Sequence, residues 1–234
     1  VLQMGEDPGS VHVVGSLGVD NIVRLGLPDR AALEDRLGVS LGEPVGLVTV
    51  HPETLAAGEL RAAAARGVVE AARGFPLTWV VTLPNADPGH EAVRAALHSW
   101  AQENSRVHVY ASLGEQNYLG VMRLAALVLG NSSSGLIEAP SMRVPTVNVG
   151  DRQKGRVRSP SVLDAPCDGR SIAEAIEKAL SPEFQELVRR QPLPFGDGHA
   201  AETILRVLKH HDFPRPLVKA FRDLERASSR HGAC

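Results

Sequence analysis

The segment Val45-Gly46-Leu47-Val48-Thr49-Val50 is short, apolar and rich in β-branched residues, and His51-Pro52 follows it directly. These features predict a buried strand that ends at His51. The next stretch, residues 55–73, is rich in Ala, Arg and Leu and is closed by Gly74 and Pro76, as is typical of a helix. Together the two segments form one strand–helix unit.

The same alternation recurs along the chain. Short apolar runs predict further strands at 11–14, 77–82, 106–110, 126–129 and 145–149, and helical patterns occupy 90–102 and 117–125. Strands that alternate with helices form a parallel sheet with helices on its faces. We therefore predict an α/β fold, a Rossmann-like doubly wound parallel sheet with a helical C-terminal tail.

The pattern changes after Ser171, where helical segments follow one another without strands. They fall at 171–180, 182–190, 199–211 and 216–228. We predict that residues 1–200 form the Rossmann-like domain and residues 201–234 the helical tail.

The composition excludes several classes of protein. Acidic residues outnumber Lys and Arg by 27 to 25, so a broad basic face for nucleic acid is not expected. No window approaches the roughly 18 apolar residues of a membrane helix, and two cysteines cannot build a disulfide framework or a thiolate metal cage. The first residues also lack the basic start and apolar core of a signal peptide. We expect a cytoplasmic protein without nucleic-acid or membrane partners.

Unusual polar residues follow the predicted strands. In an open parallel sheet, ligands bind beyond the carboxyl ends of the strands, so these loops should open on one edge. They are 15–21, 51–54, 84–89, 111–115, 131–135 and 150–156.

The loop Asn131-Ser132-Ser133-Ser134-Gly135 precedes a short helix predicted from Leu136. Backbone N–H groups, hydroxyls and the helix dipole would suit a diphosphate there. The alternative is that the serines only cap the helix. Glu138, in the first turn of that helix, would either complement its dipole or accept hydrogen bonds from ribose hydroxyls.

The loop 151–158 contains four basic residues, of which Arg152 is nearest the strand end. Arg152 could clamp a pyrophosphate, whereas the other three would face solvent or a partner domain; a solvated basic loop is the alternative. His51 would donate to a phosphate or move a proton, or have a structural role. Asn85 would contribute to the site or only to its turn. No metal-binding or P-loop motif is present, so we expect neither a metal nor a cofactor.

Six ordered motifs carry a resemblance to a known family: 15–22, 48–54, 83–89, 131–140, 147–156 and the turn Phe195-Gly196-Asp197-Gly198-His199-Ala200. Over residues 1–210 the chain resembles the UDP-N-acetylglucosamine 2-epimerases, especially the hydrolysing branch. That family has two Rossmann-like domains facing each other, as in GT-B glycosyltransferases. This chain resembles the C-terminal half, and the resemblance implies that residues 1–200 are a UDP-binding domain.

The resemblance implies a role for particular residues. His51 and Arg152 would lie around the diphosphate, Ser132 and Ser133 at the phosphate, and Glu138 at the ribose. Asn85 and the backbone near Leu113 would lie toward the nucleotide, with Ser134 and Gly135 in the same phosphate-binding turn. The first loop departs from the family pattern at Ser16-Leu17, where Pro-Gly is commoner, and Glu53 replaces a frequent valine.

The family reaction eliminates UDP from the sugar and then adds water, giving N-acetylmannosamine and UDP, as in sialic acid biosynthesis. The catalytic carboxylates belong to the N-terminal half, so His51 is the one catalytic candidate in this chain. We expect as partners a UDP-sugar, an N-terminal half from the same gene or a second chain, and a homo-oligomer. Two alternatives are a nucleotide-sugar-binding module without catalysis and the donor domain of a GT-B glycosyltransferase.

Overall fold

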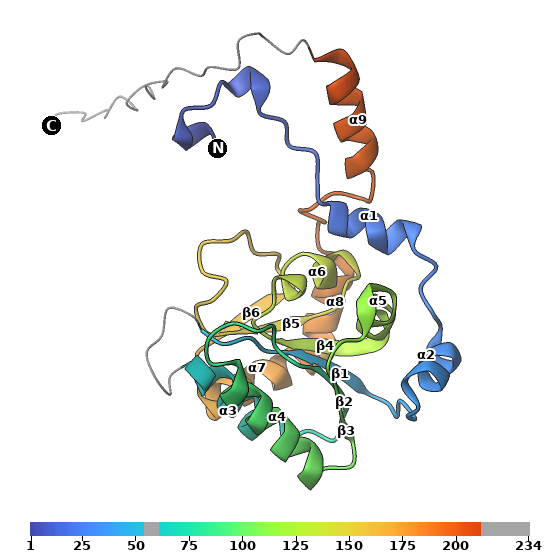
Figure 1. The fold of residues 1–234 in the computed structure, drawn as a ribbon, viewed down its shortest axis with the longest axis vertical. Coiled ribbons are helices and arrows are strands. Elements are labelled where there is room, and N and C mark those ends of the chain that lie inside the picture. The colour runs from blue at the N-terminus through green and yellow to red at the C-terminus, as the bar shows by residue number, and fades with distance from the viewer. Residues whose placement is uncertain (54–60, 212–234) are drawn as a thin grey trace, which may run out of the picture.

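A computed structural model describes residues 1–53 and 61–211. Its centre is a six-stranded sheet in the order β3-β2-β1-β4-β5-β6, in which every pair of neighbours is parallel (Figure 1). This is the strand order of the Rossmann fold, so the predicted fold class is confirmed. The strands are β1 (Val45–Thr49), β2 (Thr78–Thr82), β3 (Val107–Tyr110), β4 (Ala125–Gly130), β5 (Thr146–Val149) and β6 (Val162–Ala165).

Helices cover both faces of the sheet, and neighbouring positions along a strand point into different cores. Val48 and Trp79 pack against one layer of helices, while Leu47 and Val80 pack against the other. The first layer contains α3 (Ala63–Ala72), α4 (His90–Glu103) and α7 (Gly169–Leu180), and the second contains α2 (Arg30–Leu37), α5 (Gly114–Leu124) and α6 (Glu138–Ser141). The remaining helices are α1 (Leu17–Arg24), α8 (Pro182–Arg190), α9 (Ala200–His210) and the 3-10 turns η1 (Leu2–Met4), η2 (Pro8–Ser10) and η4 (Ser133–Gly135).

The strand predicted at 11–14 is wrong. This run is extended but pairs with no described strand, and the Val13 side chain is 98% exposed. The β-branched sequence favours an extended backbone, but a strand also needs a neighbour, and this run lies beside α9, where His12 contacts His211. Strand β6 and helices α1 and α2 were not predicted.

Helix α1 is joined to the start of α9 although 180 residues separate them in sequence. The carboxylate of Asp20, on α1, accepts hydrogen bonds from the backbone N–H groups of Ala200 and Ala201 at 2.9 and 2.7 Å. The backbone N–H of Ser16 donates to the Phe195 carbonyl. These contacts join α9 and the N-terminal segment into one arm that rises from the sheet domain (Figure 1).

Most of the other predicted helices are present. The helix predicted at 216–228 and part of that at 55–73 lie outside the described residues. The boundary between residues 200 and 201 stays a prediction. In the two described ranges, no helix combines the length and the hydropathy needed to cross a membrane.

Candidate functional site

The loops that follow the strands meet at the carboxyl edge of the sheet. Because all six strands run in the same direction, the segments after β1, β2, β4 and β5 open on this edge. The loop 15–21 was expected there as the continuation of a strand, which is wrong. It reaches the edge through α1, which contacts α6.

Asn131 connects the residues of this edge. Its side chain is fully buried; its Oδ1 accepts from the His51 backbone N–H at 2.7 Å and its Nδ2 donates to the His51 carbonyl at 2.9 Å. Its own carbonyl accepts from Arg152 Nη1 at 3.2 Å and from Gln153 Nε2 at 2.8 Å. Asn131, directly after β4, therefore brings His51 and Arg152 together with the start of the turn at residues 132–135, called the serine turn below.

Sequence reasoning missed Asn131 as a site residue. The available signal was an amide directly after an apolar strand, a place where a buried polar group needs partners. The structure supplies those partners from the loops after β1 and β5.

His51 is held in place by Asn85 from the loop after β2. The imidazole Nδ1 lies 3.0 Å from Asn85 Oδ1 and 3.4 Å from the Asn85 backbone nitrogen. Burial, together with the positive charge of Arg152, lowers the pKa of His51 below its ordinary 6.5. The imidazole is therefore neutral at pH 7, despite its position among phosphate-binding candidates.

The serine turn contains the 3-10 turn Ser133–Gly135, which precedes the short helix α6. Ser132 caps it by accepting from the Ser134 backbone N–H at 3.4 Å, and Ser134 Oγ donates to Ser132 Oγ at 3.0 Å. The helix predicted from Leu136 begins at Glu138 and has four residues, so its dipole is small. The hydroxyl groups of this turn are therefore its candidate donors to an anion, and Arg152, which bonds to the Asn131 carbonyl from the loop after β5, is the candidate charged donor beside it.

Gly135 packs the turn onto the sheet. It is buried, its carbonyl accepts from Thr146 Oγ1 at 2.7 Å, and an added Cβ would come within 2.8 Å of Thr146 Cγ2. Glycine is therefore required here for close packing.

Glu138 lies half-buried where α6 meets α1. Burial raises its pKa, and so does the charge of Glu115. Gly18 leaves room for the Glu138 side chain, because a Cβ there would be 2.4 Å from Oε1. Within the described ranges no Lys or Arg pairs with Glu138, so its carboxylate keeps acceptor capacity for a ligand.

The basic loop after β5 divides into different roles. Lys154 forms an exposed ion pair with Asp151 at 3.2 Å, and Arg156 is exposed. Arg158, expected to face solvent or a partner, instead pairs with Asp164 at 3.1 Å and donates to the Gln153 carbonyl at 2.9 Å. The Arg158 guanidinium therefore holds the loop in place through Asp164 and the Gln153 carbonyl. Arg152 is the basic residue of this loop that bonds to Asn131 at the carboxyl edge of the sheet.

Glu53, where the sequence departs from the family pattern, contacts the loops that follow β5 and β6. Its Oε1 accepts from the Asp151 backbone N–H at 3.2 Å and lies 3.7 Å from Cys167 Sγ. Burial and the Glu53 charge raise the pKa of Cys167 to about 11, so the thiol stays protonated.

Leu113 precedes α5 and is buried in the second core, where its carbonyl accepts from Asn117 Nδ2 at 3.1 Å. Its proposed place beside a nucleotide stays a prediction. Across residues 1–53 and 61–211, no three His, Cys, Asp or Glu side chains are grouped to bind a metal.

A strand order of 3-2-1-4-5-6, with polar side chains converging at the carboxyl edge, defines a Rossmann-type α/β protein. Proteins of this class bind their ligands at the switch point of the strand order, on the same edge. The family model described as UDP-N-acetylglucosamine 2-epimerase matches residues 1–209. The chain belongs to this family.

Two relatives are similar in sequence to most of this chain. The chain is 34% identical to the Escherichia coli polysialic acid biosynthesis protein P7 over 225 residues, which are 95% of this chain and 56% of the relative. It is 32% identical to a GDP/UDP-N,N'-diacetylbacillosamine 2-epimerase (hydrolyzing) of Campylobacter jejuni, over 80% of this chain and 48% of the relative. The chain thus spans about half the length of these relatives.

A solved structure confirms the fold. The UDP-GlcNAc 2-epimerase of Neisseria meningitidis, bound to UDP-GlcNAc, matches with a TM-score of 0.74 and 20% identity. The match covers 90% of this chain and 58% of that one.

Proposed function

We propose that this chain binds UDP and a UDP-linked amino sugar at the carboxyl edge, as the nucleotide-binding half of a hydrolysing 2-epimerase. The observation that carries the proposal is Asn131, which holds His51 and Arg152 beside the serine turn. A guanidinium next to hydroxyl donors suits a diphosphate. Glu138, which has no cationic partner in the described chain, suits the ribose hydroxyls.

In the proposed reaction, a base removes the proton from the second sugar carbon while the bond between the first carbon and the UDP oxygen breaks, which releases UDP and leaves a glucal-like intermediate. Water then adds across the double bond: its hydroxyl goes to the first carbon and a proton returns to the opposite face of the second carbon, which gives N-acetylmannosamine. This half stabilises the negative charge that develops on the leaving diphosphate. Arg152 contributes a positive charge, Ser132 and Ser133 contribute hydroxyls, and neutral His51 contributes no further charge.

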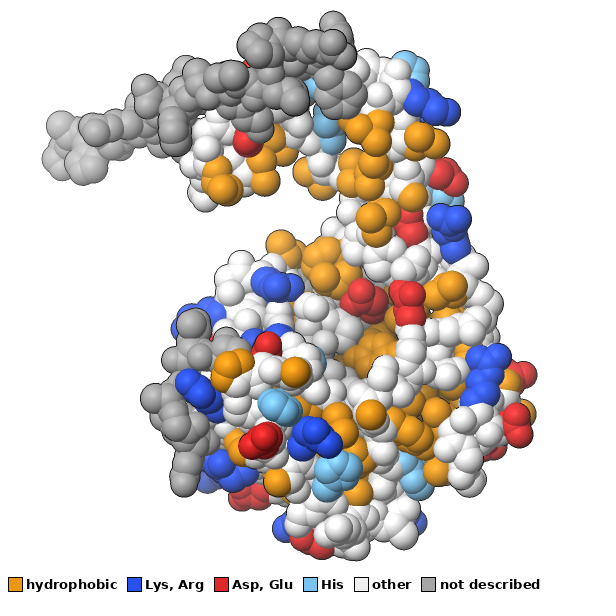
Figure 2. All heavy atoms as spheres, viewed as in Figure 1, with side chains coloured by type: hydrophobic (Ala, Val, Ile, Leu, Met, Phe, Trp, Pro, Cys, Tyr) orange, Lys and Arg blue, Asp and Glu red, His pale blue; other side chains and the backbone are white. Residues whose placement is uncertain are grey.

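The acid and base groups of this reaction come, in the proposal, from an N-terminal half encoded by the same gene or a second chain. Large exposed hydrophobic side chains support a docking surface for it, since most of them lie on the arm. Figure 2 shows hydrophobic side chains on the arm around the hollow beside the sheet domain. Those on the N-terminal 24 residues and α9 are Val1, Leu2, Met4, Val13, Leu17, Val23, Leu205 and Leu208.

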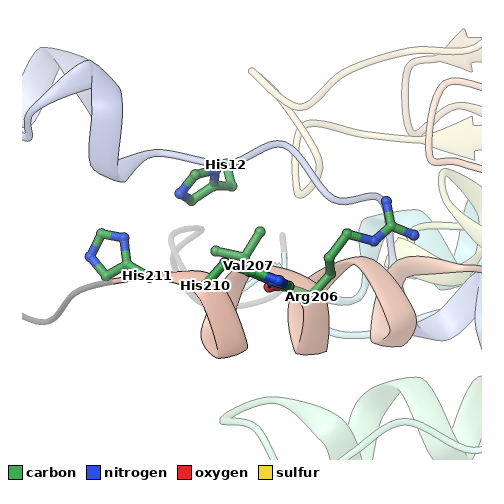
Figure 3. Close-up of a pocket in the computed structure, with 5 residues that line it drawn as sticks. All are labelled: His12, Arg206, Val207, His210 and His211. Carbon is green, nitrogen blue, oxygen red and sulfur yellow. The ribbon is translucent and has the colours of Figure 1, made fainter.

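The arm also carries a pocket of about 440 Å³, in which α9 side chains face the N-terminal segment (Figure 3). Its lining is His12, Arg206, Val207, His210 and His211. A surface of this kind, apolar with a hollow, is typical of an interaction site. A homo-oligomer and a cytoplasmic location belong to the same proposal.

Membership of the epimerase family favours this function over a glycosyltransferase donor domain. The isolated chain would act only as a nucleotide-sugar-binding module, because the catalytic carboxylates belong to the proposed other half.

Arg152 provides the test. Arg152→Lys keeps the charge but removes the planar, two-pronged donor, so UDP affinity should fall about tenfold, or about 1.4 kcal/mol. The matched control is Lys154→Ala, which removes a charge from the same loop but breaks only an exposed ion pair and should change affinity little. Calorimetry with UDP measures both. Wild-type affinity in Arg152→Lys would reduce the loop to a solvated basic turn.

A further inference from the structure

A chain of hydroxyl groups runs from the sheet to the serine turn. Thr82 and Thr49, at the ends of β2 and β1, have their Oγ1 atoms 2.8 Å apart. Thr49 Oγ1 is 3.2 Å from the Tyr118 hydroxyl on α5, which is 2.6 Å from Ser134 Oγ. Ser134 Oγ in turn lies 3.0 Å from Ser132 Oγ. The buried strand ends are therefore linked to a residue proposed to bind phosphate.

The direction of donation along this row of hydroxyl groups follows from the number of protons that each group can donate. Each hydroxyl has one proton to donate. Ser134 donates to Ser132, so its proton is already used. In the 2.6 Å bond between Tyr118 and Ser134, the donor must therefore be Tyr118. Thr49 can then donate to Tyr118, while the Thr82 hydroxyl donates to the Val48 carbonyl at 3.4 Å or to Thr49 at 2.8 Å.

Ser132 is the outer end of this row of hydroxyl groups. Its Oγ accepts from the hydroxyl of Ser134 at 3.0 Å and from the backbone N–H of Ser134 at 3.4 Å, which fills both acceptor sites. It donates to no residue in the described part of the chain. Toward a ligand, the Ser132 hydroxyl is therefore a donor only.

We infer that Tyr118 is a positioning residue that fixes Ser132 as a hydrogen-bond donor and so selects phosphate oxygens, which only accept. The inference rests on the proposed function. Tyr118 acts through Ser134 and does not itself reach the ligand. Burial raises the pKa of Tyr118 above its ordinary 10, and so does the charge of Glu138, although the bonds to Ser134 and Thr49 oppose this. The phenol therefore stays protonated and able to donate at neutral pH.

Tyr118→Phe tests the inference, because it keeps the ring and removes the hydroxyl. Ser134 then loses the donor that fixes its own proton, and the bond between Ser134 and Ser132 can reverse. We expect UDP affinity to fall about three- to tenfold, the effect of one hydrogen bond. Affinity for uridine, which has no phosphate, should not change.

The matched control is Tyr110→Phe. Tyr110 packs against the same core as Tyr118, and its hydroxyl donates to the Leu37 carbonyl at 3.2 Å, away from the serine turn. This variant removes one tyrosine hydrogen bond and should leave the ratio of UDP to uridine affinity at its wild-type value. An equal loss of that ratio in both variants would overturn the positioning role.

Ser132→Ala separates this inference from the proposed function. Because Tyr118 acts through Ser132, the double variant Tyr118→Phe/Ser132→Ala should bind UDP as Ser132→Ala does. If Ser132→Ala weakens UDP binding but Tyr118→Phe does not, the positioning role is wrong and the proposed function stands. A wild-type chain that binds UDP no better than uridine would overturn both. Should Tyr118→Phe fail to fold, Ser134→Ala breaks the chain at the next hydroxyl and should give the same phosphate-dependent loss.

Discussion

At the scale of single residues, the site combines a positive guanidinium with a histidine that stays neutral. Burial is the larger cause of the lowered His51 pKa, and the Arg152 charge adds to it, while Asn85 and Asp87 oppose the shift. Between its lowered pKa and 6.5, the unfolded chain binds a proton that the folded chain does not. His51 therefore contributes stability above pH 6.5 that is lost as the pH falls through this interval.

NMR titration of the imidazoles checks this arrangement. The His51 pKa should lie below 6.5 in the wild type and rise in Arg152→Gln, without reaching 6.5 because burial remains. His108 is the internal control, since burial alone lowers its pKa and it should not move in the variant. A His51 pKa that is unchanged in Arg152→Gln would show that the guanidinium does not face the ring.

At the scale of elements, the sequence pattern predicted five of the six strands, because each is an apolar run closed by polar or turn residues. Strand β6 was missed because only one of its four residues is buried, so Val162–Ala165 lacks a clear apolar period. The strand predicted at 11–14 is wrong for the opposite reason. The run has the apolar pattern of a strand, but it lies on the arm, where it pairs with no described strand.

The grouping of the candidate site residues His51, Asn85, Ser132 and Arg152 at one edge was predictable, because parallel strands bring their carboxyl ends together. Their roles in binding stay predictions. The links between these residues were not predictable. The bonds of Asn131 to His51 cross 80 residues, and that of Asn21 to Glu115 crosses 94. Contacts of this kind depend on how loops pack, which has no local sequence signal.

The junction between α1 and α9 gives a prediction at this scale. Asp20→Ala removes both acceptors at the N-terminus of α9, so amide hydrogen exchange in Ala200–His210 should become about fivefold faster, as for a lost helix cap. The control is Asp29→Ala, which removes the cap of α2 by the same chemistry and should accelerate exchange in Arg30–Leu37 instead. Unchanged exchange in α9 of Asp20→Ala would mean that the arm is held by other contacts.

At the scale of the whole molecule, the chain holds a complete Rossmann-type sheet and an arm with exposed apolar side chains, and spans about half the length of its relatives. We therefore expect this chain by itself to bind the nucleotide without catalysing the reaction. The residues of the proposed nucleotide-binding edge lie within the described residues, whereas the proposed acid and base groups lie in the other half.

Calorimetric titration of the 234-residue chain with UDP and with uridine, alongside a coupled assay for UDP released from UDP-N-acetylglucosamine, tests the central claim most directly. We expect UDP to bind more tightly than uridine by at least about tenfold, the worth of charge-assisted contacts to the diphosphate. We expect no turnover. Equal affinities for UDP and uridine would contradict a diphosphate site at the carboxyl edge, and turnover by the chain alone would contradict the division of labour between the two halves.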